Sequence, residues 1–113
     1  MTVKKIAGDV FYIPGATNVG VIAVNGKRGS KAKDIYLVDS GGDSEDAERI
    51  FGELTELFPM ENGGFNLVAI INTHSHADHC GGNNFFVQKT GCQVWCSRIE
   101  AAGLECSHLH VSL

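Results

Sequence analysis

The chain has 113 residues, of which 43% are hydrophobic and 19% are charged. This composition is typical of one globular domain, and it excludes collagen-like, coiled-coil and disordered chains. Nine Lys and Arg residues against thirteen Asp and Glu residues give a net charge of −4. That balance argues against nucleic acid as a partner, because a phosphate backbone attracts basic surfaces. We expect residues 1–113 to form a single unit.

The cellular compartment is predicted from what the chain lacks. No apolar segment of signal-peptide length follows Lys4 and Lys5. The longest apolar runs, Val19–Val24 and Leu67–Ile71, are too short to cross a bilayer, so no membrane partner is expected. Four cysteines are too few for a disulfide-rich secreted scaffold and are expected to be reduced. These features favour a cytoplasmic location.

The first forty residues predict strands. Ile6–Ile13 is rich in β-branched and aromatic residues and ends at Pro14-Gly15, and Thr17–Val24 has the same character. A basic loop then separates Thr17–Val24 from a third strand, Asp34–Asp39. That loop suits a phosphate contact or a solvated hairpin, and the hairpin is the favoured interpretation.

A change of period after Ser40 indicates a helix. Asp43 or Ser44 can cap its first turn, and Pro59 prevents its continuation. The apolar residues at helical spacing are Ala47, Ile50, Phe51, Leu54, Leu57 and Phe58.

The second half of the chain alternates strands and helices. Asn66–Asn72 holds a continuous apolar run, as expected for a central strand covered on both faces. A short helix near Asn84–Thr90 and a strand Gln93–Cys96 follow. Ser97 and Glu100 form a capping-box pattern that predicts another helix through about Leu104.

The last residues predict one more strand, because Leu109, Val111 and Leu113 alternate with polar residues. Strands that alternate with helices predict an α/β layered fold, in which helices cover at least one face of the sheet.

One segment concentrates the chemistry. Within Thr73–Gly82, His74, His76, Asp78 and His79 place four metal-binding side chains in six residues. In an extended segment His74 and His76 project to the same side, so both can reach one ion, while Asp78 and His79 are better placed for a second. Imidazole and carboxylate donors suit zinc first, and also iron or manganese. We therefore predict one or two metal ions, with zinc favoured.

This segment resembles the His-x-His-x-Asp-His signature of the metallo-β-lactamase fold hydrolases. The strand that ends Val38-Asp39-Ser40-Gly41 also resembles the N-terminal half of that family. The resemblance implies half of a four-layer αββα sandwich, with a mixed sheet and helices on its outer face. It also implies that His74 and His76 bind one metal, and that Asp78 and His79 bind the other.

The resemblance implies a hydrolase. In the complete enzyme a metal-bound hydroxide would attack a small-molecule ester, thioester, lactone, lactam or phosphoester, and Asp78 would be the catalytic residue that helps to position it. His76 disfavours the flavodiiron branch, which resembles this pattern with an acidic residue there. His79 disfavours the lactamase subclass with Arg at that place.

The family's further ligands, a third His, a bridging Asp and a final His, come from a C-terminal half that no segment here matches. His108 lies too close to His79 for the third His, and His108 and His110 are read as exposed strand-end residues. We therefore expect this chain alone to lack activity. Its inward sheet face would be apolar, and a homodimer that covers the missing half is the expected partner.

Two other functions remain open: a mononuclear iron dioxygenase acting on persulfides, which resembles the same signature, and a non-catalytic metal-binding module. Asp39 either orients a metal-binding His or contacts solvent. Core positions are expected for the remaining cysteines and aromatic residues of this region, Cys80, Cys92, Cys96, Phe85, Phe86 and Trp95.

Overall fold

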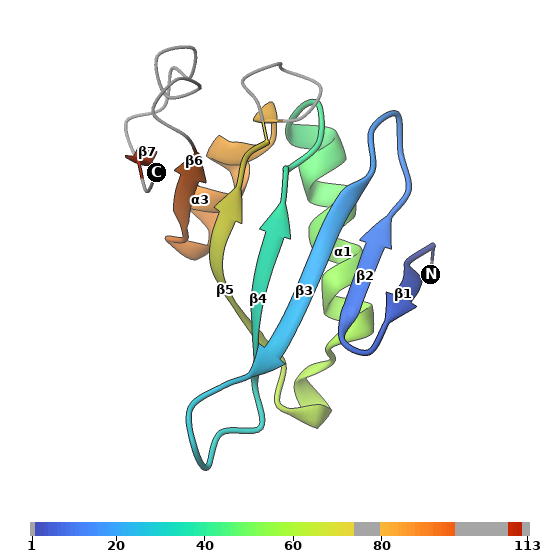
Figure 1. Cartoon of the computed structure of the whole chain (residues 1–113), viewed down its shortest axis with the longest axis vertical. Helices are drawn as coiled ribbons and strands as arrows, with labels where there is room; N and C mark the ends of the chain where they lie inside the picture. Colours follow the sequence, from blue (N-terminus) through green and yellow to red (C-terminus); the bar gives the residue numbers. More distant parts are fainter. Residues whose placement is uncertain (1, 74–79, 97–108, 112–113) are drawn as a thin grey trace.

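The computed structural model describes residues 2–73, 80–96 and 109–111. In these residues the chain forms one seven-stranded sheet, in which the strands lie side by side in chain order (Figure 1). Strands β1 to β4 are antiparallel, and β4 to β7 are parallel, so the predicted mixed sheet is confirmed. The strands are β1 (Lys4–Ala7), β2 (Val10–Ile13), β3 (Val19–Asn25), β4 (Lys33–Val38), β5 (Phe65–Ile71), β6 (Gln93–Cys96) and β7 (Leu109–Val111).

The prediction of one strand over Ile6–Ile13 is wrong. Ala7 pairs with Val10, so the chain makes a hairpin between β1 and β2 with only Gly8 and Asp9 in the turn. Gly8 has a φ of 53°, a backbone conformation that glycine adopts without a steric penalty. The Gly-Asp pair is therefore the signal that divides this apolar run into two strands.

Helix α1 (Ser44–Leu57) connects β4 to the parallel strand β5, as the periodicity predicts. Its N-cap is Asp43, whose side chain accepts a hydrogen bond from the backbone N–H of Asp46. Pro59 follows the helix, and a short 3₁₀ turn, η1 (Met60–Asn62), ends at Gly63 before β5 begins.

Helix α3 (Asn83–Thr90) connects β5 to β6 and ends at Gly91, which has a left-handed φ of 73°. The predicted helix from Ser97 to about Leu104 lies outside the described residues. The predicted last strand is present as β7, which pairs with β6 in parallel.

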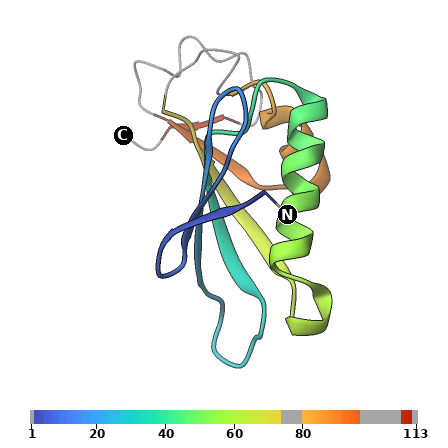
Figure 2. The same ribbon diagram turned by 90° about the vertical axis from the view of Figure 1, so that its right-hand side faces the viewer.

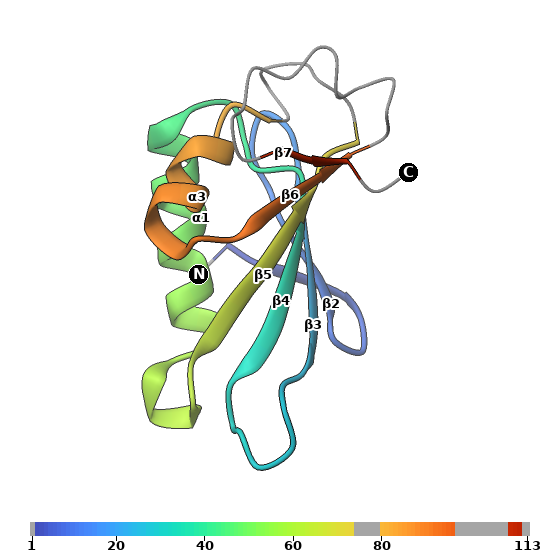
Figure 3. The same cartoon turned by 90° about the vertical axis from the view of Figure 1, so that its left-hand side faces the viewer.

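The hydrophobic core lies between the sheet and the two helices, which pack on the same face (Figures 2 and 3). Alternate residues of the central strands point into it, among them Val21, Ile35 and Leu37, and Ile50 and Leu54 of α1 meet them from the other side. All five are fully buried. The two layers, helices and sheet, are the predicted α/β arrangement.

No described helix covers the opposite face of the sheet. We call it the open face; its half-buried or exposed residues are Val10, Tyr12, Ile22, Val24, Tyr36, Val38, Ile71 and Trp95. Tyr36 and Trp95 pack on each other there, with ring centroids 6.0 Å apart. The sequence predicts that β5 is covered on both faces. Among the described residues it is covered only on the face where α1 and α3 pack (Figures 2 and 3). No helix among the described residues is long and apolar enough to span a membrane.

Candidate metal centre

The predicted ligands His74, His76, Asp78 and His79 lie outside the described residues, and so does most of the segment that contains them. Thr73 and Cys80, which flank this segment, are described. Both belong to the edge of the sheet at the carboxyl ends of β4 and β5, where ligands commonly bind in open α/β sheets.

Asp39 anchors the entry to the segment. The backbone N–H of Thr73 donates to Oδ1 of Asp39 at 2.9 Å, and the Thr73 hydroxyl donates to Oδ2 at 2.8 Å. Asp39 is only 4% exposed, so the interpretation that it contacts solvent is wrong. It also has a φ of 67°, a left-handed conformation that Asp tolerates better than most side chains. The carboxylate therefore fixes the residue immediately before His74.

The residues that follow the predicted metal motif are held by Gly41, which lies just after the end of β4. Cys80 forms a parallel bridge with Gly41, and the backbone N–H of Gly82 donates to the Gly41 carbonyl at 3.3 Å. Gly82 must be small, because a Cβ there would lie 2.1 Å from the Ser40 carbonyl oxygen. Asp39 and Gly41 are two residues apart in the sequence. Asp39 binds the residue before the predicted metal motif, and Gly41 pairs with the residue after it.

A buried polar network supports the same edge. The Ser40 hydroxyl donates to Oδ1 of Asn83 at 2.6 Å, and the side-chain amides of Asn83 and Asn72 bond to each other at 2.7 and 3.3 Å. Ser40 is fully buried and both amides are 4% exposed. Buried polar groups are stabilising only when they are paired, so this network links β4, β5 and the start of α3 in one arrangement. Sequence reasoning overlooked these three residues.

The electrostatics beside this edge are set by an ion pair. Asp46 accepts hydrogen bonds from Arg49 Nη2 at 2.6 Å and from the backbone N–H of Gly42 at 3.1 Å. Burial alone raises the pKa of the Asp46 carboxyl, but the hydrogen bonds from Arg49 and Gly42 outweigh it and lower the pKa below its ordinary value of 3.8. Asp46 therefore stays ionised and holds the turn that follows Gly41.

The other predicted positions can be compared directly. Cys92, Cys96 and Phe86 are buried, as expected for core residues, and Phe85 packs against the core. Trp95 lies on the open face instead, so its prediction as a core residue is wrong for the described chain. Cys80 is half-buried beside Gly41.

The donors present in the sequence fit a divalent metal. Three imidazoles and a carboxylate are ligands that zinc prefers, and iron and manganese accept them as well. Among the described residues alone, no cluster of three or more His, Cys, Asp or Glu side chains could hold an ion. The predicted ligands lie in residues 74–79, and the contacts above fix the described residues on either side of that segment. The chain is an α/β protein with a buried polar network at the carboxyl ends of β4 and β5, and the predicted metal motif follows β5 in the sequence.

The comparison with protein families agrees with that class. Residues 7–105 match the model of the metallo-beta-lactamase superfamily, and the chain belongs to this superfamily. The match covers most of the chain, and it confirms the resemblance inferred from the His-x-His-x-Asp-His signature.

Solved structures show the same fold. A B3 metallo-beta-lactamase with an active-site glutamic acid is 22% identical, with a TM-score of 0.77, and the match covers 100% of this chain and 46% of that one. MEM-A1, a subclass B3 metallo-beta-lactamase from a soil metagenome library, is 19% identical, with the same TM-score and the same shares. A double mutant of the sec-alkyl sulfatase PisA1 is 19% identical, with a TM-score of 0.63 over 88% of this chain and 15% of that one. The chain thus spans about half the length of these lactamases, which confirms the predicted half of the fold.

Proposed function

We propose that this chain is the metal-binding half of a metal-dependent hydrolase. The observation that carries the proposal is the anchoring of both flanks of residues 74–79 to the end of β4, through Asp39 and Thr73 on one side and Gly41 and Cys80 on the other. A segment held at both ends loses less conformational entropy when its side chains converge on an ion. Membership of the metallo-beta-lactamase superfamily supports the same conclusion.

The proposed ligands are His74 and His76 for one ion, and Asp78 and His79 for a second, with zinc as the favoured metal. When bound, the metal would supply Lewis-acid chemistry, polarising a substrate oxygen and lowering the pKa of a water molecule. Asp78 would orient that water as the catalytic residue. Asp39 would act as a positioning residue, because its hydrogen bonds fix Thr73 and hence the start of the ligand segment.

The proposed substrates are small molecules with an ester, thioester, lactone, lactam or phosphoester bond. The fold alone does not choose among them, since it is shared by lactamases and by an alkyl sulfatase. We further propose that the 113-residue chain binds metal without turnover, because it spans about half the length of the lactamases it matches.

Zinc titration of the metal-free chain tests the ligand assignment. The double variant His74→Ala and His76→Ala should lose zinc uptake, measured by calorimetry and by metal analysis after gel filtration. Asp39→Asn should bind zinc about tenfold more weakly, since it keeps the backbone conformation but weakens the hold on Thr73. Asp9→Asn, which removes one negative charge in the β1–β2 turn, is the matched control and should bind zinc as the wild type does. Unchanged zinc stoichiometry in the double variant would refute the assignment.

A substrate panel tests the reaction class, and it is applied to a longer chain expressed with the sequence downstream of Leu113. Hydrolysis of one bond type in a panel of a β-lactam, a lactone, a thioester and a phosphodiester supports the hydrolase. One iron per chain with oxygen uptake on a persulfide replaces it with the dioxygenase alternative. Tight metal binding with no turnover on either kind of substrate indicates the non-catalytic module.

We also propose that a second copy of the chain covers the open face. Val10 and Val24 are 38% and 40% exposed there, on the same face as the Tyr36–Trp95 pair, and an apolar surface of this kind favours association. Trp95→Glu should therefore yield a monomer by sedimentation velocity, while Gln88→Glu, on the exposed side of α3, should not change the wild-type dimer. A wild-type chain that stays monomeric at high concentration would exclude this partner.

A further inference from the structure

A cavity lies at the end of β5 opposite to Asp39 and Thr73. It has a volume of about 340 Å³ and opens between the second half of α1, η1, the first residues of β5 and the end of α3. Thr73, the described residue before the motif, follows the other end of β5, about 20 Å away for a strand of this length. The pocket lies on the helix-covered side of the sheet, so it is separate from both the candidate metal centre and the open face.

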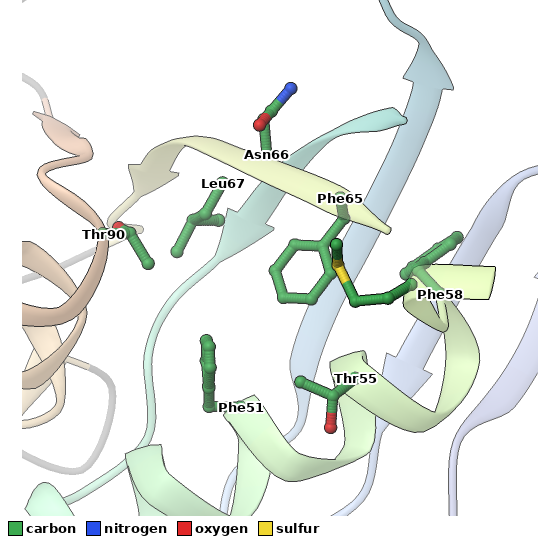
Figure 4. Close-up of a pocket in the computed structure, with 8 residues that line it drawn as sticks. Phe51, Thr55, Phe58, Phe65, Asn66, Leu67 and Thr90 are labelled. Carbon is green, nitrogen blue, oxygen red and sulfur yellow. The ribbon is translucent and has the colours of Figure 1, made fainter. Parts of the chain in front are cut away.

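Aromatic rings form its walls. Figure 4 shows Phe51 of α1 and Phe65 of β5 among the side chains that line the pocket, and their rings contact each other edge to face. Their ring centroids are 5.8 Å apart, and Phe58 lies 6.2 Å from Phe65. Met60, which is 83% exposed, supplies a flexible thioether at the rim. Walls of this kind suit a small flat apolar group, because offset and edge-to-face ring contacts add to the gain from burial.

One cation stands beside these rings. Nζ of Lys89, in the last turn of α3, is 5.4 Å from the centre of the Phe51 ring. Lys89 forms no ion pair with any residue that the structure describes. An anionic group on a ligand seated against Phe51 would therefore meet a positive charge that no described carboxylate pairs with.

The polar groups of the lining already have partners. The hydroxyls of Thr55 and Thr90 donate to carbonyl oxygens of their own helices, at 2.7 and 2.8 Å, and the Asn66 amide donates to Asp34 at 3.4 Å. The pocket thus presents an apolar interior, and Lys89, which does not itself line it, stands beside its Phe51 wall. Its volume falls within the range of small-molecule sites.

We propose that this pocket binds a small aromatic carboxylate, with its ring against Phe51 and Phe65 and its carboxylate near Lys89. The site does not depend on the metal centre or on the proposed hydrolase activity.

Amide-shift titration of the isotopically labelled 113-residue chain with 3-phenylpropanoate tests the proposal. The expected result is saturable binding with a Kd on the order of 1 mM, which is typical of a ligand of this size. The largest shifts should fall at Phe51, Thr55, Phe65 and Leu67. The fluorescence of Trp95, on the open face, should not change.

Two comparisons isolate the charge. Lys89→Gln should weaken binding of 3-phenylpropanoate about three- to fivefold, the size of effect expected for an exposed ion pair. It should leave binding of the neutral analogue 3-phenylpropan-1-ol unchanged. Lys5→Gln, on the edge strand β1, is the matched control and should bind both compounds as the wild type does.

A filling variant tests the location. Thr55→Trp, at an exposed position of α1 that lines the pocket, should abolish the shifts at Phe65 and Leu67. The proposal is overturned if 3-phenylpropanoate does not saturate below about 10 mM, a limit set by its expected affinity. It is equally overturned if the shifts map to the open face, or if Lys89→Gln and Lys5→Gln bind alike; these results do not require Thr55→Trp to fold.

Discussion

Replacement of Asn83 by Ala should be among the most damaging substitutions in the chain. The side chain of Asn83 makes three hydrogen bonds, one with Ser40 and two with Asn72, and all three residues are buried. Truncation leaves the Ser40 hydroxyl and both polar atoms of the Asn72 amide without these partners. Each buried polar group left unpaired costs about 1–3 kcal/mol, and water entering the vacated space recovers part of that. The expected loss is about 3–5 kcal/mol, a large fraction of the stability of a domain of this size.

Urea denaturation followed by circular dichroism measures this loss directly. The chain is kept metal-free with a chelator, because a bound ion would add its own contribution to the free energy of unfolding. Asn84→Ala is the matched control: the neighbouring side chain is exposed on the same helical turn, so its removal should change stability by less than about 0.5 kcal/mol.

A double-mutant cycle with Asn72→Ala adds a second criterion. Because the two amides bond to each other, the double variant should lose at least about 1 kcal/mol less than the sum of the single losses. The reasoning is refuted if Asn83→Ala lies within about 1 kcal/mol of the wild type with an unchanged denaturant slope.

Two further predictions concern the same end of the molecule. Gly82→Ala should destabilise the chain by about 1–3 kcal/mol, because the added Cβ meets the Ser40 carbonyl. Gly52→Ala, inside α1 with open space around it, should instead stabilise the chain by about 0.5–1 kcal/mol. Thermal unfolding of the two variants measures both effects. The lowered pKa of Asp46 contributes stability that is present above pH 3.8 and is lost as the pH falls through the folded value. Asp46→Asn should therefore flatten the acid limb of the stability curve, measured as urea midpoints, and an unchanged limb contradicts this assignment.

Much of the fold follows from local patterns. The periodicity of α1, its Asp43 cap and the stop at Pro59 depend on neighbouring residues, so they can be read directly from the chain. The hairpin at Gly8 and Asp9 also has a local signal, although the apolar run around it indicates one strand. The position of Trp95 has no such signal, because exposure of a sheet face depends on what packs against it.

The candidate site divides in the same way. The metal motif is visible because its donors are close in sequence, and its ligand role stays a prediction. The supporting contacts join residues that are distant along the chain, such as Asp39 with Thr73 and Ser40 with Asn83. Ser, Asn and Asp are common at strand ends for turn chemistry alone, so these residues have no pattern that distinguishes them before the chain is folded.

Asp39 combines a strained backbone with two hydrogen bonds that the strain makes possible. Its left-handed φ of 67° costs an ordinary side chain about 1 kcal/mol, a strain that glycine would relieve. Asp39→Gly would therefore relax the turn while releasing Thr73 from its carboxylate partner. Two hydrogen bonds to a carboxylate are worth more than this strain, so a screen for thermal stability and a screen for the proposed cation binding should both retain the acid at this codon.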